Sequence, residues 1–128
     1  MDDAIAWSER FSVGHPDIDG QHRRLVEMAN HARTLFGTRD RAAIETALAE
    51  VAEYTRTHFH DEEMLLQQVG YPELKAHIIQ HKMIIAYVEE MLANRAAVTP
   101  EEVFEFVAEW VLQHIAVTDH DYAPYLKG

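Results

Sequence analysis

The sequence contains no cysteine among its 128 residues, which excludes disulfide bonds, zinc–thiolate sites and iron–sulfur clusters. Any bound metal ion must therefore be held by nitrogen and oxygen ligands. Glycine and proline are also scarce, with five and four residues, so a loop-rich or disordered chain is not expected. The length fits a single domain, residues 1–128, that is large enough to bury a hydrophobic core.

Basic residues are few as well: the sequence has 11 lysines and arginines but 22 aspartates and glutamates, which gives a formal net charge of −11. This balance argues against a nucleic-acid surface and against anionic membranes, because both require clustered positive charge. No apolar run approaches the roughly 20 residues of a membrane span, and the first residues lack the basic and apolar pattern of a secretion signal. We therefore expect a cytoplasmic protein with neither nucleic acid nor membrane as its partner.

Apolar residues recur in steps of four and three along four segments, which is the signature of amphipathic helices. The pattern predicts an all-α fold with a non-helical arm at residues 1–17 and helices at about 18–37, 40–69, 72–95 and 100–119. Because the connections are short, helices that follow one another should lie antiparallel. The predicted architecture is an up-down-up-down antiparallel four-helix bundle with an N-terminal arm.

Residues that favour helix ends flank these segments. Asp17 or Asp19 is expected to cap the first helix, and Pro72 is expected in the first turn of the third. Thr99 should cap the fourth helix, with Pro100 at its first position. The apolar stripe of that fourth helix is predicted to consist of Val103, Val107, Trp110, His114 and Val117.

Six polar residues occupy positions where the helical period calls for a core residue. Burying a carboxylate or an imidazole is costly unless the group is paired or bound to metal. One such histidine is more often an ordinary hydrogen-bonded core residue than a ligand, but six such residues in one small bundle favour a single shared cause. The sequence therefore predicts a metal site formed by His22, His58, Glu62, His77, His81 and His114.

The remaining histidines and one aspartate fall elsewhere on the helices. His15, His31, His60 and His120 are expected on the solvated surface. Asp119 follows His114 by five residues and is turned away by about 140° on an ideal helix. Periodicity alone does not select Asp119, which reaches the site only if the helix deforms or ends there.

Four motifs together resemble single-domain bacterial members of the hemerythrin family, over a stretch from about Trp7 to Tyr122. As a set they are specific, although each is weak alone. One departure is His15-Pro16 in the arm, which lies outside the motifs. The motifs are Asp19-x-Gln21-His22-x-x-Leu25, His58-Phe59-x-x-Glu62-Glu63, Gly70-Tyr71-Pro72 with His77-x-x-x-His81, and Trp110-x-x-x-His114-Ile115-x-x-x-Asp119-x-x-Tyr122.

The resemblance implies a centre of two non-haem iron ions with an oxo or hydroxo bridge, and it adds Asp119 to the ligand set. It implies that one iron has a single open coordination position, at which O2 binds reversibly. It also implies an apolar pocket wall around that position, formed by Leu25, Phe59, Trp110 and Val111. The implied ligands are His77, His81 and His114 for one iron, His22 and His58 for the other, and Glu62 and Asp119 as bridges between them.

We therefore expect an O2-binding protein for storage, delivery or sensing, with NO or azide as other small ligands and an unidentified acceptor protein as a further partner. It is not expected to be an enzyme beyond weak oxidase or peroxidase side activity. Two alternatives stay open at this point. One is an enzyme that activates O2 or reduces peroxide or nitric oxide, and the other is a structural bundle that holds zinc or manganese, since imidazole sites do not select iron by affinity alone.

Overall fold

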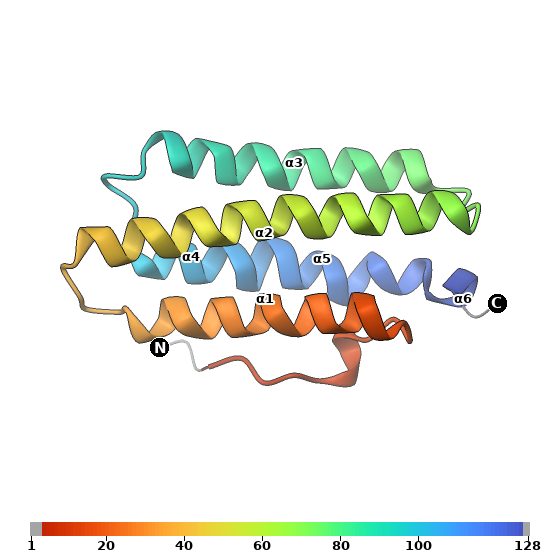
Figure 1. Cartoon of the computed structure of the whole chain (residues 1–128), viewed down its shortest axis with the longest axis horizontal. Helices are drawn as coiled ribbons and strands as arrows, with labels where there is room; N and C mark the ends of the chain where they lie inside the picture. Colours follow the sequence, from red (N-terminus) through yellow and green to blue (C-terminus); the bar gives the residue numbers. More distant parts are fainter. Residues whose placement is uncertain (1–3, 127–128) are drawn as a thin grey trace.

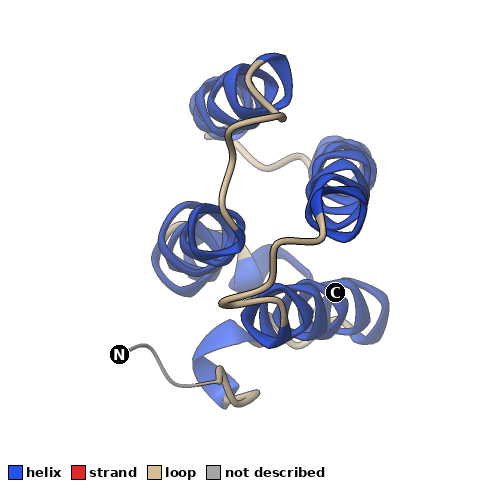
Figure 2. Ribbon diagram, turned by 90° about the vertical axis from the view of Figure 1, so that its left-hand side faces the viewer, coloured by secondary structure: helices blue, strands red, loops and turns tan. Residues whose placement is uncertain are grey.

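A computed structural model describes residues 4–126, and within that range the chain is helical with no strand. The all-α prediction is confirmed. Figure 1 shows α1 (Pro16–Thr34), α2 (Arg41–Gln68), α3 (Leu74–Ala93) and a fourth, composite segment that runs from Pro100. These four rods lie side by side around a common interior, as the end view in Figure 2 shows. None of the helices in the described range has the length and apolar character needed to cross a membrane.

The first helix begins earlier than predicted, and a different residue caps it. His15 is the N-cap, and its side chain accepts a hydrogen bond from a backbone N–H in the first turn. Asp17 and Asp19 lie inside the helix, so the predicted cap is wrong. The reason is that Asp19 binds the arm instead, accepting from the Ser12 hydroxyl at 2.7 Å and from the Val13 N–H at 2.8 Å.

The N-terminal arm follows α1 (Figure 1) and is fixed to it at two levels. Its first three residues lie outside the described range, as do the last two residues of the predicted domain. Asn30 brackets the backbone of Ile5, with its Oδ1 accepting from Ile5 N and its Nδ2 donating to Ile5 O, both at 2.7 Å. Farther along, the short 3-10 helix η1 (Glu9–Phe11) buries Phe11. The predicted non-helical arm therefore contains one helical turn.

The connection between α2 and α3 is a tight turn that extends two residues past the predicted boundary. Gly70 has a φ of +71°, a left-handed conformation that glycine adopts without strain. Tyr71 is buried, its N–H donates to Leu66 O, and its own carbonyl accepts from Leu74 N. Because these bonds close the turn around it, Pro72 precedes the helix rather than lying in its first turn, and Glu73 is the N-cap.

The fourth segment changes its helical type along its length. It consists of α4 (Pro100–Glu105), the π-helical segment η2 (Phe106–Val111) and α5 (Leu112–Val117), followed by η3 (Asp119–Asp121) and α6 (Ala123–Leu126). Thr99 caps α4 in a capping box with Glu102, as the sequence predicts. A π turn takes more residues than an α turn, so the buried position shifts from Trp110, which is 40% exposed, to Val111, which is fully buried. The predicted stripe is wrong at Trp110 and also at Val117, which is 64% exposed.

The interior has two apolar clusters with a polar layer between them. The smaller cluster contains Ile18, Leu66 and Tyr122, and the larger one contains Leu25, Phe59 and most of the remaining core. On α1, the buried His22 lies between Ile18 and Leu25, and on α2 Glu62 lies between Phe59 and Leu66. Apolar side chains therefore close the polar layer at both ends.

Candidate metal centre

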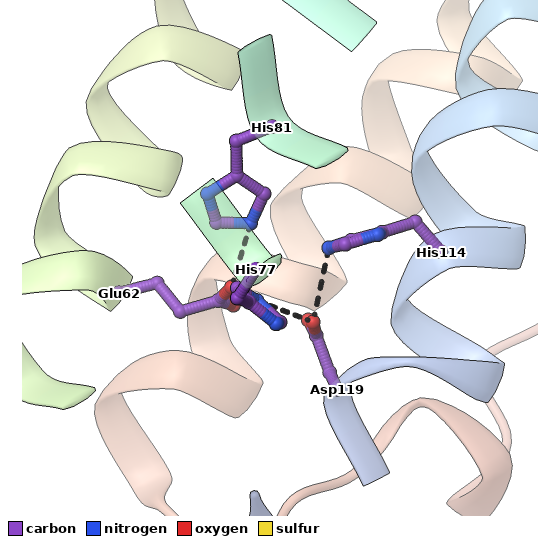
Figure 3. A group of neighbouring side chains, drawn as sticks. All are labelled: Glu62, His77, His81, His114 and Asp119. Atoms are coloured by element: carbon purple, nitrogen blue, oxygen red, sulfur yellow. Dashed lines mark hydrogen bonds and ion pairs between the residues drawn. The ribbon is translucent and has the colours of Figure 1, made fainter. Parts of the chain in front are cut away.

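All seven side chains of the expected ligand set lie together in this polar layer, and all seven are buried. Their donor atoms form two groups, and within each group these atoms lie within 4.8 Å of one another. Glu62 and Asp119 belong to both groups. Figure 3 shows the larger group, whose side chains converge from different helices on one small volume. The larger group is Glu62, His77, His81, His114 and Asp119, and the smaller is His22, His58, Glu62 and Asp119.

The helices place these donors through their regular spacing, except at Asp119. On α2, His58 and Glu62 are four residues apart and so share one face, as do His77 and His81 on α3. Asp119 gets its position because α5 ends at Val117 and the chain continues as the 3-10 turn η3. The Asp119 carboxylate is thereby fully buried, with its Oδ1 at 3.2 Å from His114 Nε2.

The outer nitrogen of three imidazoles faces an oxygen acceptor. An imidazole that donates from Nδ1 carries its lone pair on Nε2, the nitrogen that faces the interior. Histidines that bind metal are oriented in this way, with the outer N–H donating to a carbonyl or carboxylate oxygen. The three pairs are His22 Nδ1 with Phe11 O at 2.8 Å, His58 Nδ1 with Gln21 Oε1 at 2.6 Å, and His81 Nδ1 with Glu63 Oε2 at 2.8 Å.

His77 Nε2 is hydrogen-bonded to Glu62 Oε1 at 2.7 Å, but six other inner atoms of the cluster lack a hydrogen-bond partner. They are the Nε2 atoms of His22, His58, His81 and His114 and both carboxylate oxygens of Asp119. These imidazole nitrogens lie 3.0–3.8 Å from Glu62 or Asp119 oxygens, but without hydrogen-bond geometry. A single buried polar atom without a partner costs about 1–3 kcal/mol. Six such atoms aimed at one volume fit a cation as their shared partner, and a set of imidazoles and carboxylates suits a first-row transition metal.

The imidazoles and carboxylates of this layer shift one another's pKa values. Burial opposes a charge on the His22 imidazole, but its contacts with Asp119 and Glu62 outweigh burial and raise the pKa of His22 from 6.5 to about 9. The same balance raises the pKa of His77 to about 9. Burial would raise the pKa of Glu62, but contacts with four imidazoles lower it well below its ordinary value. A bound cation would displace the imidazole protons while both carboxylates stay ionised.

Three supporting residues belong to the quoted motifs, but the sequence assigns them no role. The Tyr122 hydroxyl is buried and donates to Glu62 Oε2 at 2.9 Å. Burial, together with the nearby Asp119 and Glu62 charges, raises the pKa of Tyr122, so that it remains a donor. Gln21 and Glu63 are the outer acceptors described above. Their one available signal is their fixed spacing from the ligand histidines, since neither lies on an apolar stripe.

The four residues expected to form the pocket wall do not share one environment. Leu25, Phe59 and Val111 are buried in the larger apolar cluster. The Phe59 ring stacks on His81 with centroids 3.8 Å apart and an interplanar angle of 1°. Trp110 instead lies at the surface and stacks on Tyr87 at 4.7 Å. Its role in an apolar pocket stays a prediction.

The other histidines lie away from the cluster. His31, His60 and His120 are exposed. His15 is half-buried because it caps α1. The structure therefore separates five inward-facing imidazoles from four that do not reach the site.

Comparisons with known proteins agree with this geometry. Residues 13–126 match the family model described as Hemerythrin HHE cation binding domain. The chain is 34% identical over 126 residues to the bacteriohemerythrin of Stenotrophomonas maltophilia, covering 97% of this chain and 82% of that protein. It is 31% identical to the bacteriohemerythrin of Clostridium acetobutylicum, covering 92% and 98%. A crystal structure of wild-type hemerythrin superposes with a TM-score of 0.89 at 26% identity, covering 97% and 98%. The chain belongs to the hemerythrin family.

Proposed function

We propose that this protein binds O2 reversibly at a non-haem di-iron centre. One observation carries the proposal: the buried donors form two unequal groups that share Glu62 and Asp119. Two shared carboxylates suit two neighbouring cations, because each carboxylate has two oxygens to offer. The larger group contributes three imidazoles and the smaller contributes two, so the second cation has fewer protein ligands and a position for a small exogenous ligand.

In this proposal His77, His81 and His114 hold one iron, His22 and His58 hold the other, and the two carboxylates bridge them with an oxo or hydroxo group. Two iron ions supply the two electrons that reversible O2 binding requires. Phe11 O, Gln21 and Glu63 orient three of the imidazoles through their Nδ1 atoms. Tyr122 holds the Glu62 carboxylate by donating to its Oε2.

The residues around the cluster favour binding over chemistry. Leu25, Phe59 and Val111 form an apolar boundary that limits the entry of water and anions, which slows irreversible oxidation of the centre. In this proposal the four helical segments form an up-down-up-down bundle, and the N-terminal arm packs against it. The arm contacts the site because the Phe11 carbonyl accepts a hydrogen bond from His22 Nδ1. The proposed role of the protein is O2 storage, delivery or sensing in the cytoplasm, with NO and azide as competing ligands.

The test is a visible spectrum of iron-loaded protein before O2, after O2, and after removal of O2 under argon. We expect about two iron ions per chain and a colour change that reverses. His58→Ala and His60→Ala provide a matched pair, because both histidines lie on α2 but only His58 faces the cluster. His58→Ala should abolish the reversible change, whereas His60→Ala should keep it. A colourless protein filled with zinc after growth in iron-rich medium would overturn the proposal.

A further inference from the structure

The outer face of α3 carries a stripe of exposed apolar side chains that the metal centre does not explain. Ile79, Met83 and Tyr87 follow one another in steps of four and are 59%, 61% and 39% exposed. Trp110 and Val117 lie beside them on η2 and α5. These five make up most of the large exposed apolar side chains in the described residues. Contiguous apolar surface of this kind marks an interaction site.

A second row of exposed residues on α3, which shares Ile79 and Met83 with this stripe, has the spacing of a seam that pairs with another helix. Ala76, Ile79, Met83, Ala86 and Glu90 are all exposed and follow one another in steps of three, four, three and four. Four of the five are apolar. That spacing is the seam of a two-helix contact, in which side chains of one helix pack between those of the other. Figure 1 shows α3 along the edge of the bundle opposite the arm, and no segment within residues 4–126 crosses its outer face.

The charged residues beside the stripe are basic in the N-terminal half of α3 and acidic in its C-terminal half. Lys75 and Lys82 lie in its N-terminal half, and Glu89 and Glu90 lie in its C-terminal half. Two lysines and two glutamates make this flank neutral, although the chain as a whole carries −11. Arg56 of α2 contacts Glu89 at 3.5 Å, which leaves Glu90 as the acidic residue at the end of the seam.

We propose that this face binds a second copy of the chain, with the two α3 helices packed antiparallel about a two-fold axis near Met83. Antiparallel packing places the basic half of each helix against the acidic half of the other, so that Lys75 of each copy lies near Glu90 of its partner. Such a face is complementary to itself, which is the requirement of a two-fold interface. A uniformly basic partner would place its own positive charges against Lys75 and Lys82, which disfavours it.

The edge of the interface lies next to the candidate metal centre. The Tyr87 ring stacks on Trp110, and a groove of about 350 Å³ between α3 and α5 is lined by Met83, Trp110 and His114, among others. The proposed dimer would therefore cover the groove that His114 lines.

The first test measures mass against concentration by sedimentation or light scattering, from about 1 µM to about 500 µM. We expect the wild-type chain to approach twice its mass of 14.7 kDa within this range. Met83→Lys should weaken association by at least about tenfold. Met64→Lys is the matched control, because Met64 is an exposed methionine on α2, 46% exposed, and the charge change is the same. A monomer throughout, or equal weakening by both variants, would overturn the proposal.

The second test identifies the occupant as another copy in this orientation. Lys75→Glu alone and Glu90→Lys alone should each weaken the dimer several-fold, because each places like charges together in both halves of the interface. The double variant Lys75→Glu with Glu90→Lys restores opposite charges and should recover association. All variants are checked by circular dichroism for an unchanged fold. A double variant no stronger than the weaker single variant would contradict antiparallel pairing of α3.

Discussion

At the scale of single residues, the cluster depends on side chains that are not ligands themselves. Each outer hydrogen bond fixes the orientation of an imidazole ring, so that its Nε2 points inward. Gln21 is notable because it connects two helices, accepting from His58 Nδ1 and donating from Nε2 to Asp61 at 3.1 Å. The hydrogen-bond acceptor for His58 Nδ1 is thus a neutral amide, whereas the acceptor for His81 Nδ1 is the Glu63 carboxylate. The two halves of the site therefore receive different electrostatic support.

Replacing Gln21 should weaken the two-imidazole half of the centre. In Gln21→Leu the side chain keeps its approximate size but loses the acceptor, so the His58 ring is free to turn. Outer partners of this kind are worth roughly 10–100-fold in metal affinity. We expect faster loss of iron to a competing chelator, followed by absorbance. Gln21→Glu, which keeps an acceptor, should retain most of the affinity, and Gln67→Leu on the exposed side of α2 should behave as wild type. Equal iron retention in all three variants would contradict a role for this bond.

At the scale of elements, the fourth segment departs most from regular geometry. The π-helical η2 behaves as one extra residue inserted between two α-helical parts, which keeps Val107 and Val111 buried on one face. The end of α5 then allows the turn into η3 that brings Asp119 beside His114. Irregular helices are common at functional sites because they re-aim side chains that a regular helix would misplace.

Removing one residue should therefore be tolerated in η2 and not in a regular helix. Deleting Ala108 closes the wide turn and leaves α4 and α5 in register. Deleting Ala86 from α3 rotates everything beyond it by about 100° and turns Val88 and Met91 out of the core. We expect a loss of unfolding free energy of about 1 kcal/mol for the first deletion and more than about 3 kcal/mol for the second. Chemical denaturation followed by circular dichroism measures both. A larger loss for the Ala108 deletion would show that η2 is not an inserted turn.

At the scale of the whole molecule, the buried cluster makes stability depend on metal and on pH together. Without metal, two buried carboxylates are compensated by protonated imidazoles. The pKa of His22 and that of His77 are raised from 6.5 to about 9 in the folded chain. Their stabilising contribution is therefore fully present below pH 6.5 and is lost as the pH rises through about 9.

Metal-free protein should accordingly lose thermal stability as the pH is raised from 6.5 to beyond about 9. Iron-loaded protein should lose much less, because neutral imidazoles are the form that binds metal. The difference in melting temperature between the two forms should widen over this range, and iron uptake at pH 7.5 should release about two protons. Scanning calorimetry and a proton-release titration measure these effects. Parallel melting curves for the two forms would contradict the protonated cluster.

Much of this protein follows from local physical chemistry that can be read along the chain. The four stretches of periodic apolar residues predicted the four helical segments, because burial of its apolar face is the main source of stability for an amphipathic helix. Polar residues on those periods identified six of the seven cluster side chains, because a buried charge needs a partner. The cap of α1 and the position of Pro72 were predicted wrongly, since each depends on contacts that form only when the arm and the turn fold.

The tertiary structure alone decided how the pieces meet. Residue spacing could not place Asp119, because the position of Asp119 depends on where α5 ends. It also could not predict that Trp110 is exposed, because a pattern with a period of 3.6 residues does not detect a π-helical turn. The partners of the outer imidazole nitrogens come from distant positions, such as Phe11 for His22 and Glu63 for His81. Sequence thus determined which side chains must be buried. Only the packed bundle determined what each of them faces, because that depends on distances between helices and not on spacing along one of them.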